Sequence, residues 1–244
     1  MVEFLSSRRF LAIYSVCLTI IFAVTVLAGF ARPLQNASFD QITVRRMNVV
    51  EPDGTVRLIV SDKAEFPGLY LHGKETQRPD RGDSAGMLFV NDEGTEDGGL
   101  IYGGRKEAGS GPSSFSHLSF DQYDQDQTLV LGASLEGGKR TSGVMVNDVA
   151  SFPITPEYVA AVERVKMMPQ GAARSAEWAK LNESYPPGAE RGFFGRQKDD
   201  SVGMSLSDAS GHVRAILTVK PDGEPVLQFM NAEGKVTKEI TGEN

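Results

Sequence analysis

The N-terminal part of the chain contains an uncharged apolar run that is long enough to cross a lipid bilayer. From Phe10 to Ala31 there are 22 residues without a charged side chain, and all are apolar except Ser15, Thr19, Thr25 and Gly29. As a helix rising about 1.5 Å per residue, this run extends about 33 Å, which matches a hydrocarbon core about 30 Å thick. It therefore predicts a transmembrane helix over residues 10–31.

A cleaved signal peptide is the alternative interpretation of this run. Val26-Leu27-Ala28 has the small-residue pattern of a cleavage site, and Arg8 and Arg9 could form the charged region before it. The run is longer than the usual signal-peptide core of about 7–15 residues, which favours a retained anchor. The sequence leaves open whether the segment is cleaved.

The charges around the run predict its orientation. Arg8 and Arg9 lie directly before it, so the positive-inside rule places residues 1–9 in the cytoplasm and the rest of the chain outside. Arg32, Arg45 and Arg46 on the far side act against this orientation.

Small residues recur within the run at a helical spacing. Ser15, Thr19 and Ala23 are four residues apart and so fall on one side of a helix. Such a row permits close approach of another membrane helix, although a row of three also arises by chance. We expect these residues to be the helix-packing side, with other membrane subunits and the lipid bilayer as partners.

The composition is that of a folded, mildly acidic chain. Among 244 residues there are 25 Lys and Arg against 32 Asp and Glu, a net charge of −7, so no nucleic-acid partner is expected. The chain has one cysteine, while 26 Gly and 12 Pro favour many short strands joined by tight turns. We expect a linker and first strand over residues 32–46 and a mainly β extracytoplasmic domain over 47–244.

Four turns in this domain follow one pattern. An acid or amide, two further residues and a glycine occur at Glu51–Gly54, Asn91–Gly94, Asp208–Gly211 and Asn231–Gly234. Glycine supplies the positive φ that closes a hairpin, and the side-chain oxygen three residues earlier can bind free amides of the turn. These turns lack a fixed period, which argues against a solenoid or propeller. They predict an antiparallel β-sheet, sandwich or barrel-like, with Gly54, Gly94, Gly211 and Gly234 as structural turn residues.

A short two-helix insert interrupts the β pattern at about residues 150–190. Thr155-Pro156-Glu157 provides a helix cap, a first-turn proline and a first-turn acid, and a second helix is expected from Ala173 to Glu183. Its expected role is to cover an open end or edge of the sheet.

Reactive motifs are not recognisable in the sequence. His72, His117 and His212 stand apart from one another, and the acidic stretch Asp121–Asp126 lacks the glycine and terminal glutamate of an EF-hand loop. We expect that stretch to be a solvated turn. The sequence predicts no catalytic, cofactor-binding or metal-binding residue, no cofactor and no enzymatic activity.

Two hairpins carry a resemblance to other proteins. Each has an acid, a glycine three residues later and an arginine three residues after that, namely Glu51, Gly54 and Arg57, then Asp208, Gly211 and Arg214. Both arginines could pair with an acid across the hairpin or clamp a ligand. The chain resembles uncharacterised bacterial membrane-anchored proteins with an N-terminal apolar segment and D-x-x-G-x-x-R β-hairpins. This resemblance implies a bacterial envelope protein and no particular activity.

These observations lead to an expected function. We expect a non-catalytic accessory or scaffolding subunit of a bacterial membrane protein complex, of respiratory, photosynthetic or secretion type. It would lie in the inner membrane with a cytoplasmic N-terminus and a periplasmic C-terminal domain. The alternative is an envelope solute-binding protein or enzyme whose polar groups come together only in the fold.

Overall fold

The computed structural model describes residues 8–30, 36–107, 109 and 111–242. It divides into two units, Met1–Thr43 and Val44–Asn244. Helix α2 (Arg8–Phe30) belongs to the first unit, and it is long and apolar enough to span a membrane or to act as a signal sequence. The cytoplasmic segment expected at 1–9 and the linker expected at 32–46 lie outside the described residues at 1–7 and 32–35.

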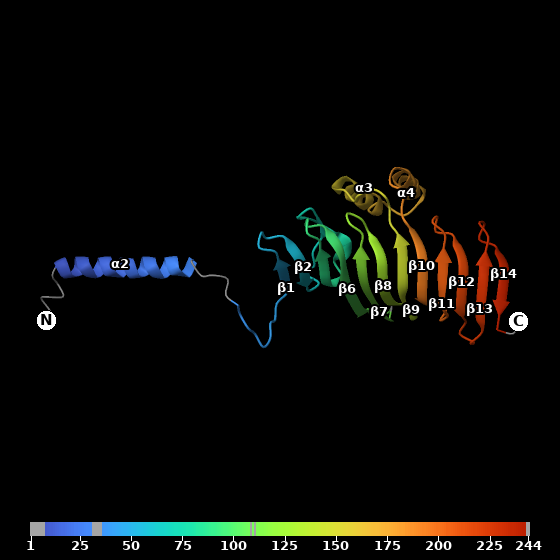
Figure 1. The fold of residues 1–244 in the computed structure, drawn as a ribbon, viewed down its shortest axis with the longest axis horizontal. Helices are drawn as coiled ribbons and strands as arrows, with labels where there is room; N and C mark the ends of the chain where they lie inside the picture. Colours follow the sequence, from blue (N-terminus) through green and yellow to red (C-terminus); the bar gives the residue numbers. More distant parts are fainter. Residues whose placement is uncertain (1–7, 31–35, 108, 110, 243–244) are drawn as a thin grey trace. The chain divides into compact units, whose positions relative to one another are not determined.

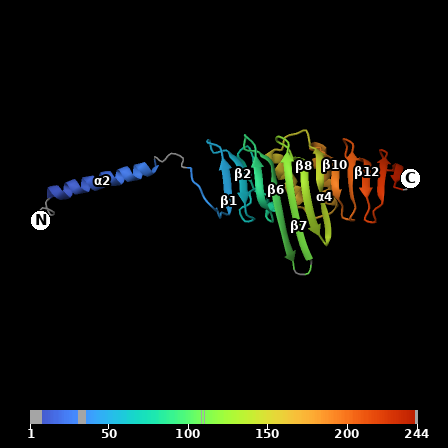
Figure 2. The same cartoon turned by 60° about the horizontal axis from the view of Figure 1, so that its bottom comes forward.

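The second unit is built on one large antiparallel sheet (Figure 1). Its twelve strands are β1 (Arg46–Val50), β2 (Val56–Ser61), β5 (Ala85–Val90), β6 (Glu96–Glu107), β7 (Gly111–Asp121), β8 (Gln127–Glu136), β9 (Lys139–Asp148), β10 (Ala189–Arg196), β11 (Val202–Ser207), β12 (Val213–Val219), β13 (Pro225–Met230) and β14 (Val236–Thr241). Each strand pairs with the one before and after it in this order, so the sheet is a meander (Figure 2).

The prediction of a mainly β fold with a large antiparallel sheet is confirmed, but the sandwich or barrel-like arrangement is wrong for this chain. A barrel would need β1 to pair with β14, and in the described residues these are the two edges of the sheet. A sandwich would need a second sheet of similar size, and the second sheet consists of β3 (Leu69–Leu71) and β4 (Lys74–Thr76). Short connections add most strands beside the last, which extends a single layer.

Short turns of one geometry join several of the strands. At the four predicted turns, the amide of Gly54, Gly94, Gly211 or Gly234 donates to the carbonyl three residues earlier, and each glycine has φ between 74° and 95°. The same bond forms from Gly223 to Lys220, in a turn that the pattern did not include because it begins with a lysine. A positive φ explains why glycine occupies these places.

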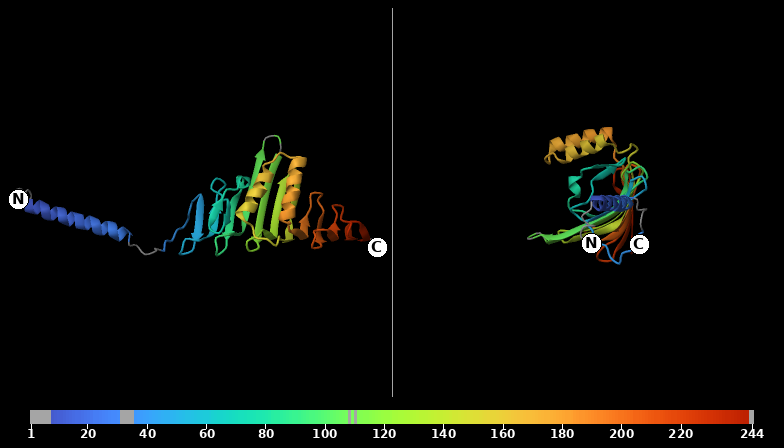
Figure 3. Two further views of the ribbon diagram at one scale, coloured as in Figure 1. Left: turned by 90° about the horizontal axis from the view of Figure 1, so that it is seen from above. Right: turned by 90° about the vertical axis from the view of Figure 1, so that its left-hand side faces the viewer.

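Two segments cover part of one face of the sheet. The β3–β4 hairpin lies between β2 and β5 in sequence, and helices α3 (Pro156–Lys166) and α4 (Ala172–Ser184) lie between β9 and β10, which confirms the two-helix insert. Figure 3 shows the helices over the central strands, with the orange to red strands beyond them left uncovered.

The buried core sits under these covering segments and is small. Ile59, Leu88 and Val90 of the sheet pack against Tyr70 of β3. On the other side of β3, Leu69 and Leu71 pack against Val159 of α3. The hairpin is therefore the layer that joins the sheet to the insert.

Candidate functional site

The face of the sheet turned away from the insert is lined by an uninterrupted row of apolar side chains. Residues paired directly across neighbouring strands point to the same face, so the pairing register traces rows across the sheet. The middle row has one residue from every strand: Met47, Val60, Met87, Leu100, Leu118, Leu131, Val144, Phe194, Met204, Leu217, Leu227 and Ile240. All twelve are apolar.

A second row lies two residues further along each strand and has the same character. It consists of Val49, Leu58, Phe89, Gly98, Phe120, Leu129, Val146, Gly192, Leu206, Ala215, Phe229 and Lys238. Its one charged member, Lys238, belongs to the edge strand β14. We call the surface formed by the middle row and this second row the apolar face.

The apolar face is open to solvent along its whole length. Not one residue of the middle row is buried, and the exposed fraction reaches 60% for Phe194, 46% for Leu217 and 41% for Leu131. In the second row, Leu206 is 51% exposed and Phe229 41%. Apolar patches on soluble monomers rarely exceed a few hundred Å², and larger ones mark contact with another protein or with lipid. A continuous row over twelve strands is much larger than that.

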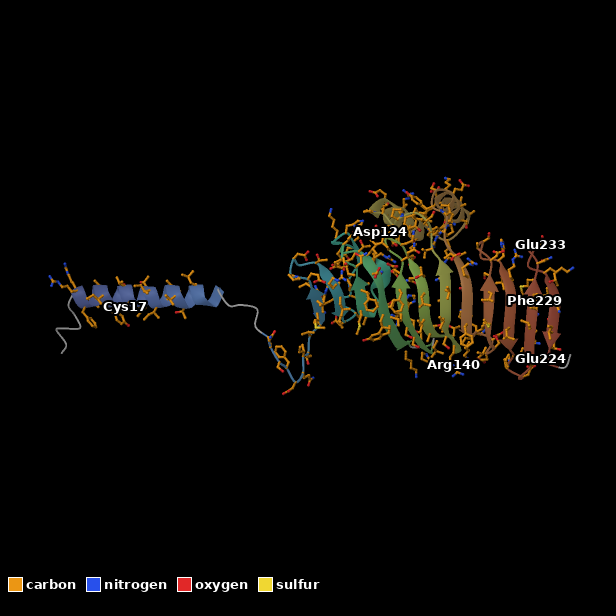
Figure 4. The ribbon with its side chains drawn as sticks, viewed as in Figure 1. Cys17, Asp124, Arg140, Glu224, Phe229 and Glu233 are labelled. Carbon is orange, nitrogen blue, oxygen red and sulfur yellow. The ribbon has the colours of Figure 1, made fainter. Side chains whose placement is uncertain are left out.

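The opposite face differs in composition where the insert does not cover it. Along β11, the apolar-face residues Val202, Met204 and Leu206 alternate with Gly203, Ser205 and Ser207. Phe229 is the next-to-last residue of β13, and Figure 4 shows it between the charged residues Glu224 and Glu233, which lie beyond the two ends of the strand. In β11 the sheet thus has one apolar side and one small or polar side, whereas in β12 and β13 the opposite face also carries Ile216 and the buried Val226.

Phe193 explains how the opposite face can carry so many glycines. A Cβ on Gly143 or Gly195 would lie within 2.9 Å of the Phe193 ring, so this ring fills the space that their side chains would take. A Cβ on Gly195 would also lie 2.0 Å from the Ser142 carbonyl oxygen. Close packing of backbone and ring requires glycine at these positions.

A polar cavity of about 210 Å³ lies between the covered face, β3 and α3. Arg81 enters it from the 3-10 helix η1 (Pro79–Arg81) and binds Glu96 at the start of β6, with 2.6 Å between Nη2 and Oε1. Asp121 ends β7, and Asp124 lies in the turn that follows (Figure 4). One oxygen each of Glu96, Asp121 and Asp124 is buried without a hydrogen-bond partner.

Asp121 is the most perturbed acid of this cavity. Burial raises its pKa to about 7, and the negative charges of Glu96, Asp126 and Asp97 act in the same direction. The expectation of a solvated turn is therefore wrong for Asp121. The reason is that α3, which follows more than thirty residues later in the chain, covers this end of the sheet. Asp121 follows two residues after Ser119 of β7, which the structure shows to be buried.

The residues predicted to pack helices are exposed on α2. Ser15, Thr19 and Ala23 all lie within this helix and have exposed side chains. The hydroxyl of Thr19 donates to the backbone carbonyl of Ser15 at 2.8 Å, so its polar group is satisfied within the helix. Thr19 can therefore meet another helix without leaving its hydroxyl unpaired.

The two repeated arginines bind acids of their own hairpins. Arg214 donates from Nε to Asp208 Oδ2 at 2.7 Å, and Arg57 Nε lies 3.3 Å from Glu51 Oε1. Arg57 also pairs with Asp92 of the neighbouring turn. Both arginines therefore brace turns at the same position of matching hairpins. In the described part of the chain, no three His, Cys, Asp or Glu residues are arranged to hold a metal ion.

Comparison of the chain with protein-family models, with curated proteins and with solved structures found no significant match. The apolar face, the cavity and helix α2 are therefore the features of this chain that bear on its function.

Proposed function

We propose that this chain is a non-catalytic scaffolding subunit of a bacterial inner-membrane assembly, and that its apolar face is the surface through which it assembles. The observation that carries this proposal is the middle row, in which twelve strands in succession present an apolar, at least partly exposed side chain. Covering this surface removes apolar area from water at a gain of roughly 25 cal/mol per Å².

The meander suits such a role because it gives length without a large core. Each added strand lengthens the face by about 4.8 Å, so twelve strands present a surface about 55 Å long. A surface of this kind can bind a partner along its whole length. It gives little support to a catalytic site, which requires side chains converging in a hollow.

Helix α2 supplies the proposed attachment to the membrane. The proposal takes it as a retained anchor with residues 1–9 in the cytoplasm and the sheet in the periplasm, because Arg8 and Arg9 precede the apolar run. Ser15, Thr19 and Ala23 would add a contact with the membrane helix of another subunit. The proposed assembly is a respiratory, photosynthetic or secretion complex.

The test compares two adjacent residues of β13 that point to opposite faces. The full-length chain carrying Phe229→Lys places a charge on the apolar face, and Gln228→Lys places the same charge on the opposite face beside Glu239. Each protein would be purified from membranes in mild detergent and its mass measured. We expect wild type and Gln228→Lys to run as assemblies and Phe229→Lys to run as a single chain. A single-chain mass for wild type would refute the proposal.

A second candidate function, binding of a small envelope solute, is favoured by the cavity beneath α3. Its volume of about 210 Å³ and its three unpaired carboxyl oxygens would suit a small organic cation. Melting of the full chain with and without 1,4-diaminobutane tests this candidate, with Asp121→Asn as the control. A rise in melting temperature for wild type alone would support it.

A further inference from the structure

We propose that the partner on the apolar face is a second copy of this chain, and that the two sheets stack face to face as a twofold-symmetric sandwich. This inference rests on the proposed function, because it names the partner for the same surface. The sandwich expected of one chain would then be completed by two. Three properties of the face lead to this partner.

The first property is its area. With strands about 4.8 Å apart and two rows about 7 Å apart, which together cover about 13 Å along each strand, the face measures about 700 Å² per copy. Two copies would bury about 1,400 Å² together, which is within the range of about 1,200–2,000 Å² for stable, specific interfaces. A partner that covers the whole face must be as long as the face, and a second copy of the sheet has that length.

The second property is the charge pattern. The middle row has no charged residue, and the second row has one, Lys238, on the edge strand. A charged partner would find no complementary charges along these rows. In a twofold dimer each residue near the axis meets its own copy, so a charge there would face a like charge. The middle row is uncharged, so a twofold dimer would bring no like charges together along it.

The third property is the shape. Sheets of L-amino acids share one hand of twist, and two sheets with the same twist pack face to face with their strands about 30° apart. A second copy of this sheet has the same twist, so its apolar face can follow the twist of the first. Side chains of different size along the middle row, such as Phe194 beside Met204, can interdigitate across the interface.

The proposed twofold axis runs along the stack of strands. It places β1 of one copy over β1 of the other, and the middle row of one copy over the middle row of the other.

This arrangement makes a specific prediction about distances between copies. Met47 on β1 and Ile240 on β14, at the two ends of the middle row, should each lie near the same residue of the other copy. Their neighbours Asn48 and Glu239 point to the opposite face and should not. All four side chains are exposed, so their reactivity can be compared directly.

The experiment is cysteine crosslinking of the full-length chain in membranes. In a Cys17→Ser background, Met47→Cys, Asn48→Cys, Glu239→Cys and Ile240→Cys would each be treated with a short bismaleimide. We expect Met47→Cys and Ile240→Cys each to give at least about fivefold more dimer than its opposite-face neighbour, as residues close to a twofold axis should.

Each other outcome would overturn the inference in a recognisable way. If neither Met47→Cys nor Ile240→Cys crosslinks alone but membranes containing both variants together give a dimer, the copies form a head-to-tail pair. Equal crosslinking of both faces would mean edge-to-edge pairing of strands. Crosslinks to a different protein would leave the proposed function standing and remove the second copy as the partner. A single-chain product throughout, together with a single-chain mass in detergent, would overturn both.

Discussion

Replacing Asp121 by asparagine should remove a pH dependence from the stability of the sheet unit. A carboxyl group whose pKa is raised by folding binds its proton more tightly in the folded chain than in the unfolded chain. Folding is therefore most stable below the unfolded-state pKa of about 4, and stability falls as pH rises towards the folded pKa of about 7. Asparagine resembles the protonated acid in shape and carries no charge, so the variant should lack this loss.

The magnitude follows from the size of the shift. The full difference between 3.8 and about 7 corresponds to about 4 kcal/mol. Because Asp121 keeps part of its surface in contact with water, we expect about half of this, roughly 2 kcal/mol, at pH 8. For a unit of about 200 residues, that amounts to a rise in melting temperature of about 4–8 °C. At pH 5, about one unit above the unfolded-state pKa, roughly two fifths of this loss is already present, so the variant should melt only about 2–3 °C above wild type.

The assay is thermal unfolding of the full chain followed by circular dichroism at pH 5 and pH 8. Asp62→Asn provides a control of opposite sign, since a hydrogen bond from Arg45 lowers the pKa of Asp62. The bond between Asp62 and Arg45 stabilises the folded chain above the unfolded-state pKa of Asp62, and this stabilisation is lost as pH falls. Asp62→Asn should therefore be less stable than wild type at pH 8. If Asp121→Asn melts at or below the wild-type temperature at pH 8, Asp121 is not a buried acid that resists ionisation.

Further predictions concern the anchor and the sheet. Intact protein should stay with membranes through an alkaline carbonate wash and keep the peptides that precede α2 in mass spectrometry, and a soluble chain starting near Gly29 would contradict this. Thr19→Leu should lower recovery of the assembly without affecting insertion, because it widens the small-residue side of α2; unchanged recovery would exclude that side as a contact. Gly195→Ala should lower the free energy of unfolding by about 2–4 kcal/mol, because its Cβ would lie 2.0 Å from a carbonyl oxygen. Gly132→Ala should be close to neutral, because the nearest atom to its Cβ would lie 3.6 Å away. Chemical denaturation of both variants measures the difference. Equal effects of the two alanines would show that the crowding at Gly195 is not real.

The turns were the part of the fold that the sequence predicted best, because the interactions that form a turn lie within a few neighbouring residues. Gly54 and Gly211 adopt positive φ for reasons contained in four neighbouring residues, and the helix cap at Thr155 depends on its own hydroxyl, which accepts from the Tyr158 amide at 3.2 Å. The turn at Gly223 was missed because Lys220 replaces the expected acid or amide, although Asp222 and Gly223 carried the same signal.

The arrangement of layers could not be predicted from the sequence. Alternation of apolar and polar residues shows that one face of a strand is apolar, but it does not show what covers that face. Met204 and Leu206 alternate with serine and glycine in β11 as they would in the strand of a sandwich. The sequence therefore predicted a covering sheet within the chain, and the described residues place twelve strands in one layer instead. The cavity was missed for a similar reason, since Asp121 is covered by a helix distant in sequence.

The central claim is that the apolar face is covered in the assembled protein, and the labelling rate of one cysteine on that face tests it most directly. Leu131→Cys, in a Cys17→Ser background, would be labelled with a maleimide in intact assemblies and again in the Phe229→Lys variant. Leu131 is 41% exposed in the single chain and lies five strands from Phe229. The account predicts that labelling is at least about tenfold slower in the assembly than in the variant, since a covered side chain is shielded from solvent. Equal rates in the two proteins would show that the face stays open, and would contradict the account.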